Sequence, residues 1–329
     1  VHMRGLLRDV TFEACAFEGF GSSRSANASA GGGAVVLGGG FGASSAAGVS
    51  AITIRGCEFE GNDNVVGVYI RSGPGAQARH GVKVVDNIFQ GGRGVAGIQN
   101  AVYVLGEDGE PIGDVDVSGN EFSMGGPVDV CIELNHVDGF SIHHNTIGFR
   151  PAQPHSTGIL LRNGAANGVV SENSVAGASS GRQVGIALLA FEGGGIIENI
   201  RVRENDVSGF AAHGIAADRG SRSVVIEDNR ISACGEGVRV TASRSVRIAK
   251  NLIDDCGTSV GFWRTATGSG PQDVVVEGNR IRPAAGGRAF GGTGLGDPGA
   301  PAVRMRWNDV SSPPEAPIPG SAPSGERSS

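Results

Sequence analysis

One short phrase returns eleven times along this chain, and no other feature of the sequence restricts the possible folds as strongly. The phrase reads apolar, any residue, apolar, two residues of any kind, Asn or Cys, any residue, apolar; residues 224–231 (VVIEDNRI) are a clean copy. Its polar slot is held by Cys15, Cys57, Asn87, Asn120, Asn145, Asn173, Asn205, Asn229, Asn251, Asn279 and Asn308. Successive slots lie 22 to 42 residues apart. An internal period of this size indicates a solenoid of stacked coils.

Each copy of the phrase predicts two short strands joined by a bend. Apolar and polar residues alternate before the slot, as in residues 200–203 (IRVR), which is the period of a half-buried strand. The step across the slot breaks this alternation and predicts a tight turn, where Asn is favoured because it tolerates left-handed backbone angles. The Asn side chain carries both a donor and an acceptor. We therefore expect the Asn side chains of stacked coils to form a ladder of hydrogen bonds.

A third strand, usually led by Gly, follows in most copies. Examples are residues 67–71 (GVYIR), 158–162 (GILLR), 185–188 (GIAL), 214–218 (GIAAD) and 237–240 (GVRV), while residues 102–104 and 130–133 take the same place without the Gly. Three strands per coil, each paired in parallel with its equivalent one coil away, predict an all-β right-handed solenoid of about eleven coils. The 57 Gly residues suit its many bends. Because aromatic residues make up only 5% of the chain, we expect a core of Val, Ile, Leu and Ala.

The phrase V-x-I-x-x-N-x-I followed by G-I-x-L resembles the single-stranded right-handed parallel β-helix of the pectate-lyase-like superfamily. The resemblance runs from about Val10 to Val310. Members of that superfamily include polysaccharide lyases, glycoside hydrolases, uronan epimerases, phage tailspikes and surface proteins without known catalysis. The resemblance therefore implies a polysaccharide or glycan partner and an extracellular or cell-surface location, but it does not choose among the reactions.

The two ends of the chain lead to expectations about domain organisation. Residues 1–310 are expected to form one β-helix domain, and the Pro/Ser-rich residues 311–329 a disordered tail. The coils begin by Val10, which leaves no room for the helix that usually caps this fold, so we expect a fragment of a longer protein whose N-terminal cap is missing. The chain shows no signal peptide and no transmembrane run, so no membrane insertion is expected.

Charge and cysteine usage restrict the partners further. The net charge of −6 argues against a nucleic-acid partner, and the oligomeric state is not indicated. No Cys/His spacing typical of zinc occurs, so no metal site and no cofactor are predicted; Ca²⁺ stays open, although no calcium motif is present. Cys234 and Cys256 hold equivalent positions on adjacent coils and are expected to be neighbouring thiols. His143 and His144 are interpreted as surface residues on a different sheet.

The outer face of the Gly-led strands is the predicted site, because the superfamily binds its substrates along such a face. Counted from the Gly, the second and fourth positions point outward. The fourth positions are interpreted as Arg71, Leu105, Glu133, Arg162, Leu189, Asp218 and Thr241. The second positions are interpreted as Tyr69, Tyr103, Cys131, Leu160, Ala187, Ala216 and Arg239. Tyr rings pack on the C–H faces of sugars, and Arg binds uronate carboxylates in a bidentate way, which indicates an acidic glycan.

Candidate residues follow from these rows and from the histidines of the neighbouring bends. The candidate catalytic residues are Glu133, Arg162, Asp218 and His136. The candidate substrate-binding residues are Tyr69, Arg71, Tyr103, His155, His213 and Arg239.

Two classes of function stay open. One is a polysaccharide lyase or uronan epimerase; its base would be Arg or His, because the only two Lys residues, Lys83 and Lys250, lie away from the predicted face. Hydrolysis is less favoured, since the phrases typical of polygalacturonases are missing. The other class is a non-catalytic glycan-binding or surface scaffold, in which Glu133 and Arg162 are an ordinary cross-strand ion pair.

Overall fold

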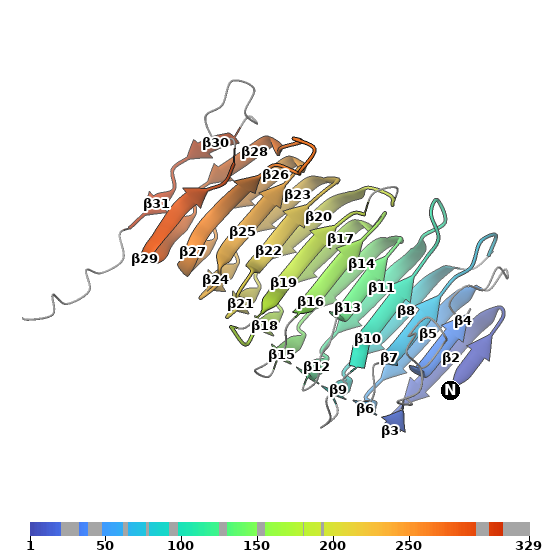
Figure 1. The fold of residues 1–329 in the computed structure, drawn as a ribbon. Coiled ribbons are helices and arrows are strands. Elements are labelled where there is room, and N and C mark those ends of the chain that lie inside the picture. The colour runs from blue at the N-terminus through green and yellow to red at the C-terminus, as the bar shows by residue number, and fades with distance from the viewer. Residues whose placement is uncertain are drawn as a thin grey trace, which may run out of the picture.

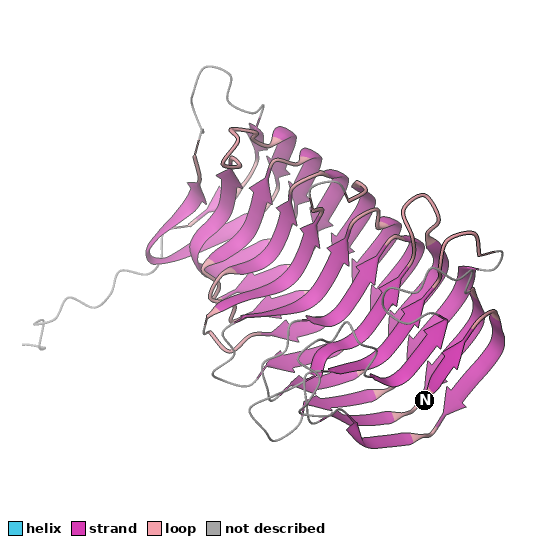
Figure 2. Cartoon of the chain, turned by 45° about the vertical axis from the view of Figure 1, so that its right-hand side comes forward, coloured by secondary structure: helices cyan, strands magenta, loops and turns pink. Residues whose placement is uncertain are grey.

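The chain forms a right-handed parallel β-helix in which strands of successive coils stack along one axis (Figures 1 and 2). The computed structural model describes residues 1–20, 33–38, 48–61, 65–76, 79–91, 98–124, 130–149, 155–179, 181–191, 194–293 and 303–311. All pairings between named strands are parallel, and every strand bonds to its equivalent in the next coil. No α-helix occurs in these ranges, and hence none that is long and apolar enough to cross a membrane.

Three rows of strands run along the rod. The first row, which precedes the polar slot, is a sheet of eleven strands: β2 (Leu7–Glu13), β5 (Val49–Arg55), β8 (Arg79–Val85), β11 (Ile112–Ser118), β14 (Val137–His143), β17 (Ala166–Ser171), β20 (Ile197–Arg203), β23 (Ser221–Glu227), β26 (Arg244–Ala249), β28 (Gln272–Glu277) and β30 (Val303–Arg306). The second row, which follows the slot, is β3 (Ala16–Phe20), β6 (Glu58–Gly61), β9 (Ile88–Gly91), β12 (Glu121–Met124), β15 (Thr146–Phe149), β18 (Ser174–Ala176), β21 (Asp206–Ser208), β24 (Arg230–Ser232) and β31 (Asp309–Val310).

The third row contains the Gly-led strands: β1 (His2–Arg4), β4 (Gly33–Gly38), β7 (Val65–Arg71), β10 (Ile98–Leu105), β13 (Val130–Asn135), β16 (His155–Arg162), β19 (Arg182–Leu189), β22 (His213–Asp218) and β25 (Glu236–Thr241). Two long strands, β27 (Leu252–Trp263) and β29 (Arg280–Gly291), run through both the second and the third rows and join them into one sheet of 20 strands.

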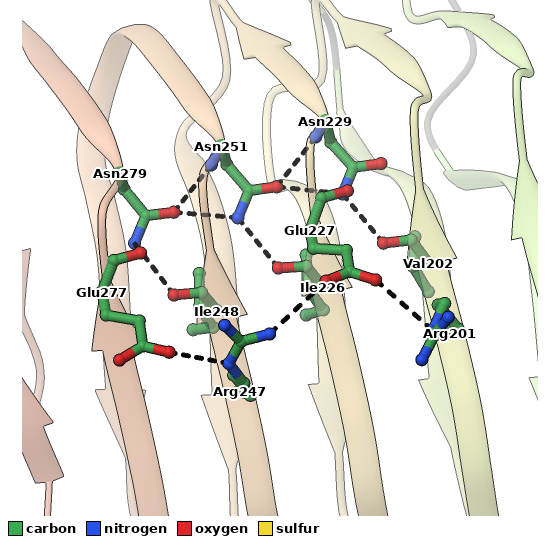
Figure 3. A network of polar contacts seen from close by, with 10 residues as sticks. All are labelled: Arg201, Val202, Ile226, Glu227, Asn229, Arg247, Ile248, Asn251, Glu277 and Asn279. Carbon is green, nitrogen blue, oxygen red and sulfur yellow. Dashed lines mark hydrogen bonds and ion pairs between the residues drawn. The ribbon is translucent and has the colours of Figure 1, made fainter.

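The Asn ladder runs along the corner between the first and second rows. In Figure 3, the Asn229 amide nitrogen Nδ2 donates to Asn251 Oδ1 at 3.0 Å, and Asn251 Nδ2 donates to Asn279 Oδ1 at 2.9 Å. The same bond links each Asn to the next from Asn87 to Asn308. Each Oδ1 also accepts the backbone N–H of the preceding ladder residue, and each Nδ2 also donates to a main-chain carbonyl such as that of Val202. The ladder thus pairs backbone groups that the bend removes from the sheets.

The left-handed residue at this corner is the one before the Asn, which corrects the expectation that the Asn itself adopts those angles. Asp228 and Lys250, for example, have φ values of 54° and 55°, while no ladder Asn has a positive φ. The bend therefore frees the Asn side chain to turn inward, where it is almost fully buried.

The core is mostly aliphatic but contains a stack of rings at its N-terminal end. Ile and Val side chains of the three rows fill the interior. Phe17, Phe59, Phe89 and Phe122, each two residues after the polar slot, lie face to face with centroids 4.6 to 4.9 Å apart. The expectation of an aliphatic core is therefore incomplete. Aromatic residues are few in the chain, but nearly a third of its 13 Phe residues gather in this one column.

Candidate functional site

The pairing of the third-row strands defines which residues of the candidate site lie side by side. The observed register differs from the predicted one by two residues at one strand, β13. Glu133 of β13 pairs with Tyr103 and Leu160, so it belongs to the second-position row and not to the fourth. The fourth position of β13 is Asn135, which pairs with Arg162. Cys131, predicted to face outward, is fully buried in the core, in the slot that Gly158 fills one coil later. Glu133 still faces outward, because it lies in register with Tyr103 and Leu160, whereas Cys131 takes the buried position at the start of the phrase.

The N-terminal end of this outer face carries the two tyrosines. Tyr69 packs with Val36 and Val66 and is only 1% exposed, and its ring lies 5.4 Å from that of Tyr103. Burial raises the pKa of both phenols, that of Tyr103 to about 12. Tyr69 is therefore a packing residue rather than an accessible sugar platform, which corrects its predicted role; Tyr103 is half-buried.

Glu133 and Arg162 form an ion pair in the middle of the face. The Arg162 Nη1 atom lies 2.8 Å from Glu133 Oε1, and Asn100 Nδ2 donates to Glu133 Oε2 at 2.6 Å. The Glu133 side chain is only 4% exposed, whereas that of Arg162 is 28% exposed. The guanidinium of Arg162 lies 4.3 Å above the ring of Phe191. Glu133 therefore orients Arg162 from below, and Arg162 is the member of the pair that a ligand can reach.

A second polar cluster lies further along the same face. His213 Nδ1 is 3.2 Å from Glu236 Oε2, and its Nε2 is 3.2 Å from Arg239 Nη1. Arg239 Nε lies 3.6 Å from Asp218 Oδ1, and the Arg239 guanidinium stands 5.6 Å from the ring of Trp263. The negative charge of Glu236 beside Nδ1 and the positive charge of Arg239 beside Nε2 both favour the His213 tautomer with its proton on Nδ1, which leaves the Nε2 lone pair toward Arg239.

Two long corner loops bracket this cluster. The corners after β22 and β25 have only two residues each, 219–220 and 242–243, whereas the corner after β19 spans residues 190–196 and the corner after β27 spans residues 264–271. Phe191 belongs to the first long loop, and its backbone N–H donates to Asn163 Oδ1 at 2.9 Å. The short corners lie between the described residues of the two long loops, and a groove results there.

Two cavities occupy this groove. One of about 370 Å³ is lined by Asp218, Arg219, Arg239 and Arg264 among others. The other, of about 420 Å³, is mostly apolar and is lined by residues that include Ile196 and Ala242. Both cavities share Phe191, Arg219, Thr265 and Ala266, so they are adjacent. The smaller cavity is lined by three guanidinium groups and by one carboxylate, that of Asp218, which pairs with Arg239.

The remaining predicted residues lie outside this groove. Arg71 pairs with Glu107 at 2.8 Å near the N-terminal end of the face. His136 sits at the corner after β13 with φ 50°, its ring against Gly164, and burial lowers its pKa. The backbone of His155 begins β16 and pairs with Arg182, but its side chain lies outside the described residues, so its predicted role stays a prediction.

Side chains that could bind a metal ion gather at most in pairs in the described part of the chain. No group of three or more His, Cys, Asp or Glu side chains there converges on a common point. All five cysteines are thiols, and those of Cys234 and Cys256, on adjacent coils, each donate to a main-chain carbonyl, that of Ser232 at 3.1 Å and that of Asp254 at 3.4 Å.

Sequence reasoning missed Phe191, Arg219, Glu236 and Trp263, which are central to the groove. They lie at the ends of the third-row strands or in the corners after them, where no periodicity marks a residue. A usable signal was the spacing of the ladder slots, 32 and 28 residues for the coils that carry the walls against 24 and 22 for those between them.

The fold and this groove define a right-handed parallel β-helix protein with a ligand-sized outer groove. The family model for the right handed beta helix region matches residues 100–281, more than half of the chain, and the chain belongs to that family. No curated protein matches the sequence closely enough to indicate a nearer relative.

Solved structures agree with this fold. The A-module of the Azotobacter vinelandii mannuronan C-5 epimerase AlgE4 superposes with a TM-score of 0.61 at 15% identity, over 98% of this chain and 91% of that one. The periplasmic alginate epimerase AlgG gives a TM-score of 0.59 at 14% identity, over 84% of this chain and 66% of that one. A tailspike variant of the E. coli bacteriophage HK620, in complex with a pentasaccharide, gives 0.63 at 13% identity, over 95% of this chain and 57% of that one. At these identities the likeness shows the fold.

Proposed function

We propose that this protein binds an acidic polysaccharide in the groove between the two long corner loops. The observation that carries the proposal is Arg219, which lines both cavities, is exposed, and has no ion-pair partner among the described residues. An unneutralised guanidinium between two cavities is suited to a uronate carboxylate, which it holds in a bidentate way.

The shape of the groove fits a chain of sugars. Cavities of a few hundred Å³ have the size of small-ligand sites, and two that are adjacent suit neighbouring residues of a polymer. Phe191, 44% exposed, stands between them and offers an aromatic face for the apolar side of a sugar ring. The structural neighbours support the same substrate class, because they include alginate epimerases and a tailspike in complex with a pentasaccharide.

A second candidate function is abstraction of the proton at C5 of a uronate, and the His213 cluster favours it. Arg219 and Arg239 would neutralise the substrate carboxylate, so that the electron pair left by the C5 proton is delocalised onto it. Once Arg239 turns to the carboxylate, His213 Nε2 is left without its guanidinium contact and can take the proton, with Glu236 holding the opposite nitrogen. Delivery of a proton from water to the other face of C5 gives epimerisation, whereas elimination breaks the C4–O bond, and the oxygen leaves with its sugar chain and takes a proton from water.

Glycan binding is tested by calorimetry with polymannuronate, polygalacturonate and a neutral dextran. We expect saturable binding of an acidic polymer that weakens as salt is raised, and a loss of about tenfold in affinity, or about 1.4 kcal/mol, in Arg219→Ala. The matched control is Arg222→Ala, which removes an exposed Arg three residues away that pairs with Glu198 on the first-row sheet. Equal binding of acidic and neutral polymers, or no binding of either, would leave the scaffold function in place.

Turnover is measured separately. Incubation of each acidic polymer in D₂O, followed by NMR, detects deuterium at C5 after epimerisation, and ultraviolet absorbance detects the unsaturated product of elimination. We expect His213→Gln to abolish either signal while retaining binding. Binding without any exchange or elimination in the parent protein would restrict the function to recognition.

A further inference from the structure

We propose that His143 and His144 form a binding site for a divalent transition-metal ion, of which Zn²⁺ is the simplest case. The two residues lie at the corner between the first and second rows, away from the groove and independent of its function. His143 ends β14, and His144 is the left-handed residue, with φ 56°, that precedes the ladder residue Asn145.

The rings face each other through their δ nitrogens. The two Nδ1 atoms are 2.8 Å apart, and the ring planes are nearly perpendicular at 83°. When two ring nitrogens point straight at each other, the centroid separation equals the N–N distance plus the two distances from centroid to nitrogen. The observed separation of 5.1 Å is close to that sum, so the nitrogens point almost directly at each other.

A carboxylate lies beside the other nitrogen, Nε2, of each ring and favours one tautomer. His143 Nε2 lies 3.4 Å from Asp116 Oδ1, and His144 Nε2 lies 3.0 Å from Glu172 Oε2. The negative charge of the carboxylate beside each Nε2 favours the proton on that nitrogen, so each neutral ring presents a lone pair at Nδ1. Two lone pairs at this distance repel each other unless a positive species lies between them. A metal-bound His commonly donates its other ring N–H to a carboxylate in this way.

The surroundings favour a metal ion of higher charge than a single proton. With both rings neutral, the two carboxylates give the site a charge of −2, and Lys83, which pairs in register with Asp116, reduces it to −1. Imidazole ligands suit Zn²⁺, Ni²⁺ and Cu²⁺ rather than Mg²⁺ or Ca²⁺. Water completes the coordination, which is consistent with the absence of a three-residue cluster in the described ranges.

The geometry requires only a small adjustment. Zn–N bonds of about 2.0 to 2.1 Å at a tetrahedral angle place the two nitrogens about 3.3 Å apart, so the rings must separate by roughly 0.5 Å. The side chains of His143 and His144 are 33% and 59% exposed and have room to move outward. The backbone beneath them is fixed, because Asn145 Nδ2 donates to the carbonyl of His143 at 3.1 Å and to Asn173 Oδ1 at 2.9 Å.

The test is calorimetry with ZnCl₂ at neutral pH in a non-chelating buffer. We expect one saturable Zn²⁺ site per chain, a loss of at least tenfold in affinity in His143→Gln and in His144→Gln, and a loss of about tenfold in Glu172→Gln, which removes only the carboxylate behind His144. The matched control is His80→Gln, an exposed His of the same first-row sheet on β8. Circular dichroism confirms that each variant is folded.

Nitrogen-15 NMR of the imidazoles distinguishes the binding atom. Coordination at Nδ1 of both rings, with the proton retained on Nε2, supports the site. The proposal is overturned if the parent protein shows no saturable Zn²⁺ binding, if both His→Gln variants bind as the parent does, or if His80→Gln weakens binding as much as they do.

Discussion

Removal of one ladder amide from the middle of the rod should destabilise the protein severely, and Asn229→Ala is the sharpest case. The Asn229 side chain accepts the Asn205 N–H at 3.0 Å and donates to the Val202 carbonyl at 3.0 Å. Both bonds are buried and Ala can replace neither; the bond to the Val202 carbonyl is drawn in Figure 3. A buried polar group that loses its partner costs about 1 to 3 kcal/mol, so two such groups give a loss of about 2 to 6 kcal/mol.

The matched variant is Asn308→Ala, which removes the last amide of the same ladder. Asn308 is half-buried, so water can replace its bonds, and the expected loss is about 1 kcal/mol. Urea unfolding of both variants compares the free energies, and hydrogen exchange reports the Asn205 amide directly, which should exchange faster in Asn229→Ala. If Asn229→Ala costs no more than Asn308→Ala, the ladder does not stabilise the corner as argued.

Three further outcomes are expected. Titration of thiols in denaturant should find five free groups, including Cys234 and Cys256; a lower number would show a disulfide. Burial lowers the pKa of His136 in the folded protein, so the unfolded chain binds a proton at this residue more readily, and stability should fall as pH drops below about 6.5. Urea midpoints measured against pH should show this decline flattened in His136→Asn, because Asn tolerates the left-handed backbone at this position. Arg162→Ala should cost about 2 kcal/mol of stability, more than Glu133→Gln, because it leaves a carboxylate that is only 4% exposed without its guanidinium. In Glu133→Gln the Arg162 side chain loses its partner but can turn to water. Thermal unfolding that ranks the two variants in the reverse order would contradict this.

The ladder could be predicted from the sequence because three requirements coincide in one slot. The bend interrupts the sheets, the slot is buried, and the Asn amide both donates and accepts there with stronger groups than the thiols of Cys15 and Cys57. The backbone angle could not be assigned in the same way. Any residue that tolerates φ near 55° serves before the slot, and the chain uses Asp228, Lys250, His144 and Gly119 among others, so no single residue type marks the position.

The register of β13 shows a different limit. Gly marks the start of the third-row phrase because an added Cβ would press on the next coil; at Gly158 it would lie 2.6 Å from the carbonyl oxygen of Gly185. In β13 the same slot holds Cys131, so that marker is missing. Alternation alone then fixes the face on which Glu133 lies but not its position along the strand, because a slip of two residues leaves the pattern unchanged.

The position of the groove follows from coil length rather than from any motif. Parallel pairing holds the strands of neighbouring coils to similar lengths, so extra residues in a coil must leave the sheets at a corner. The coils from Asn173 to Asn205 and from Asn251 to Asn279 release theirs after β19 and β27, while the two shorter coils between them turn with two residues. A pair of long coils around a pair of short ones therefore makes a recess two coils wide, about 10 Å, which is the scale of a sugar residue and its neighbour. The short corner between β22 and β23 places Arg219 at the floor of this recess, where no carboxylate of the described residues neutralises it. This guanidinium is the reason to expect that the recess prefers an acidic sugar over a neutral one.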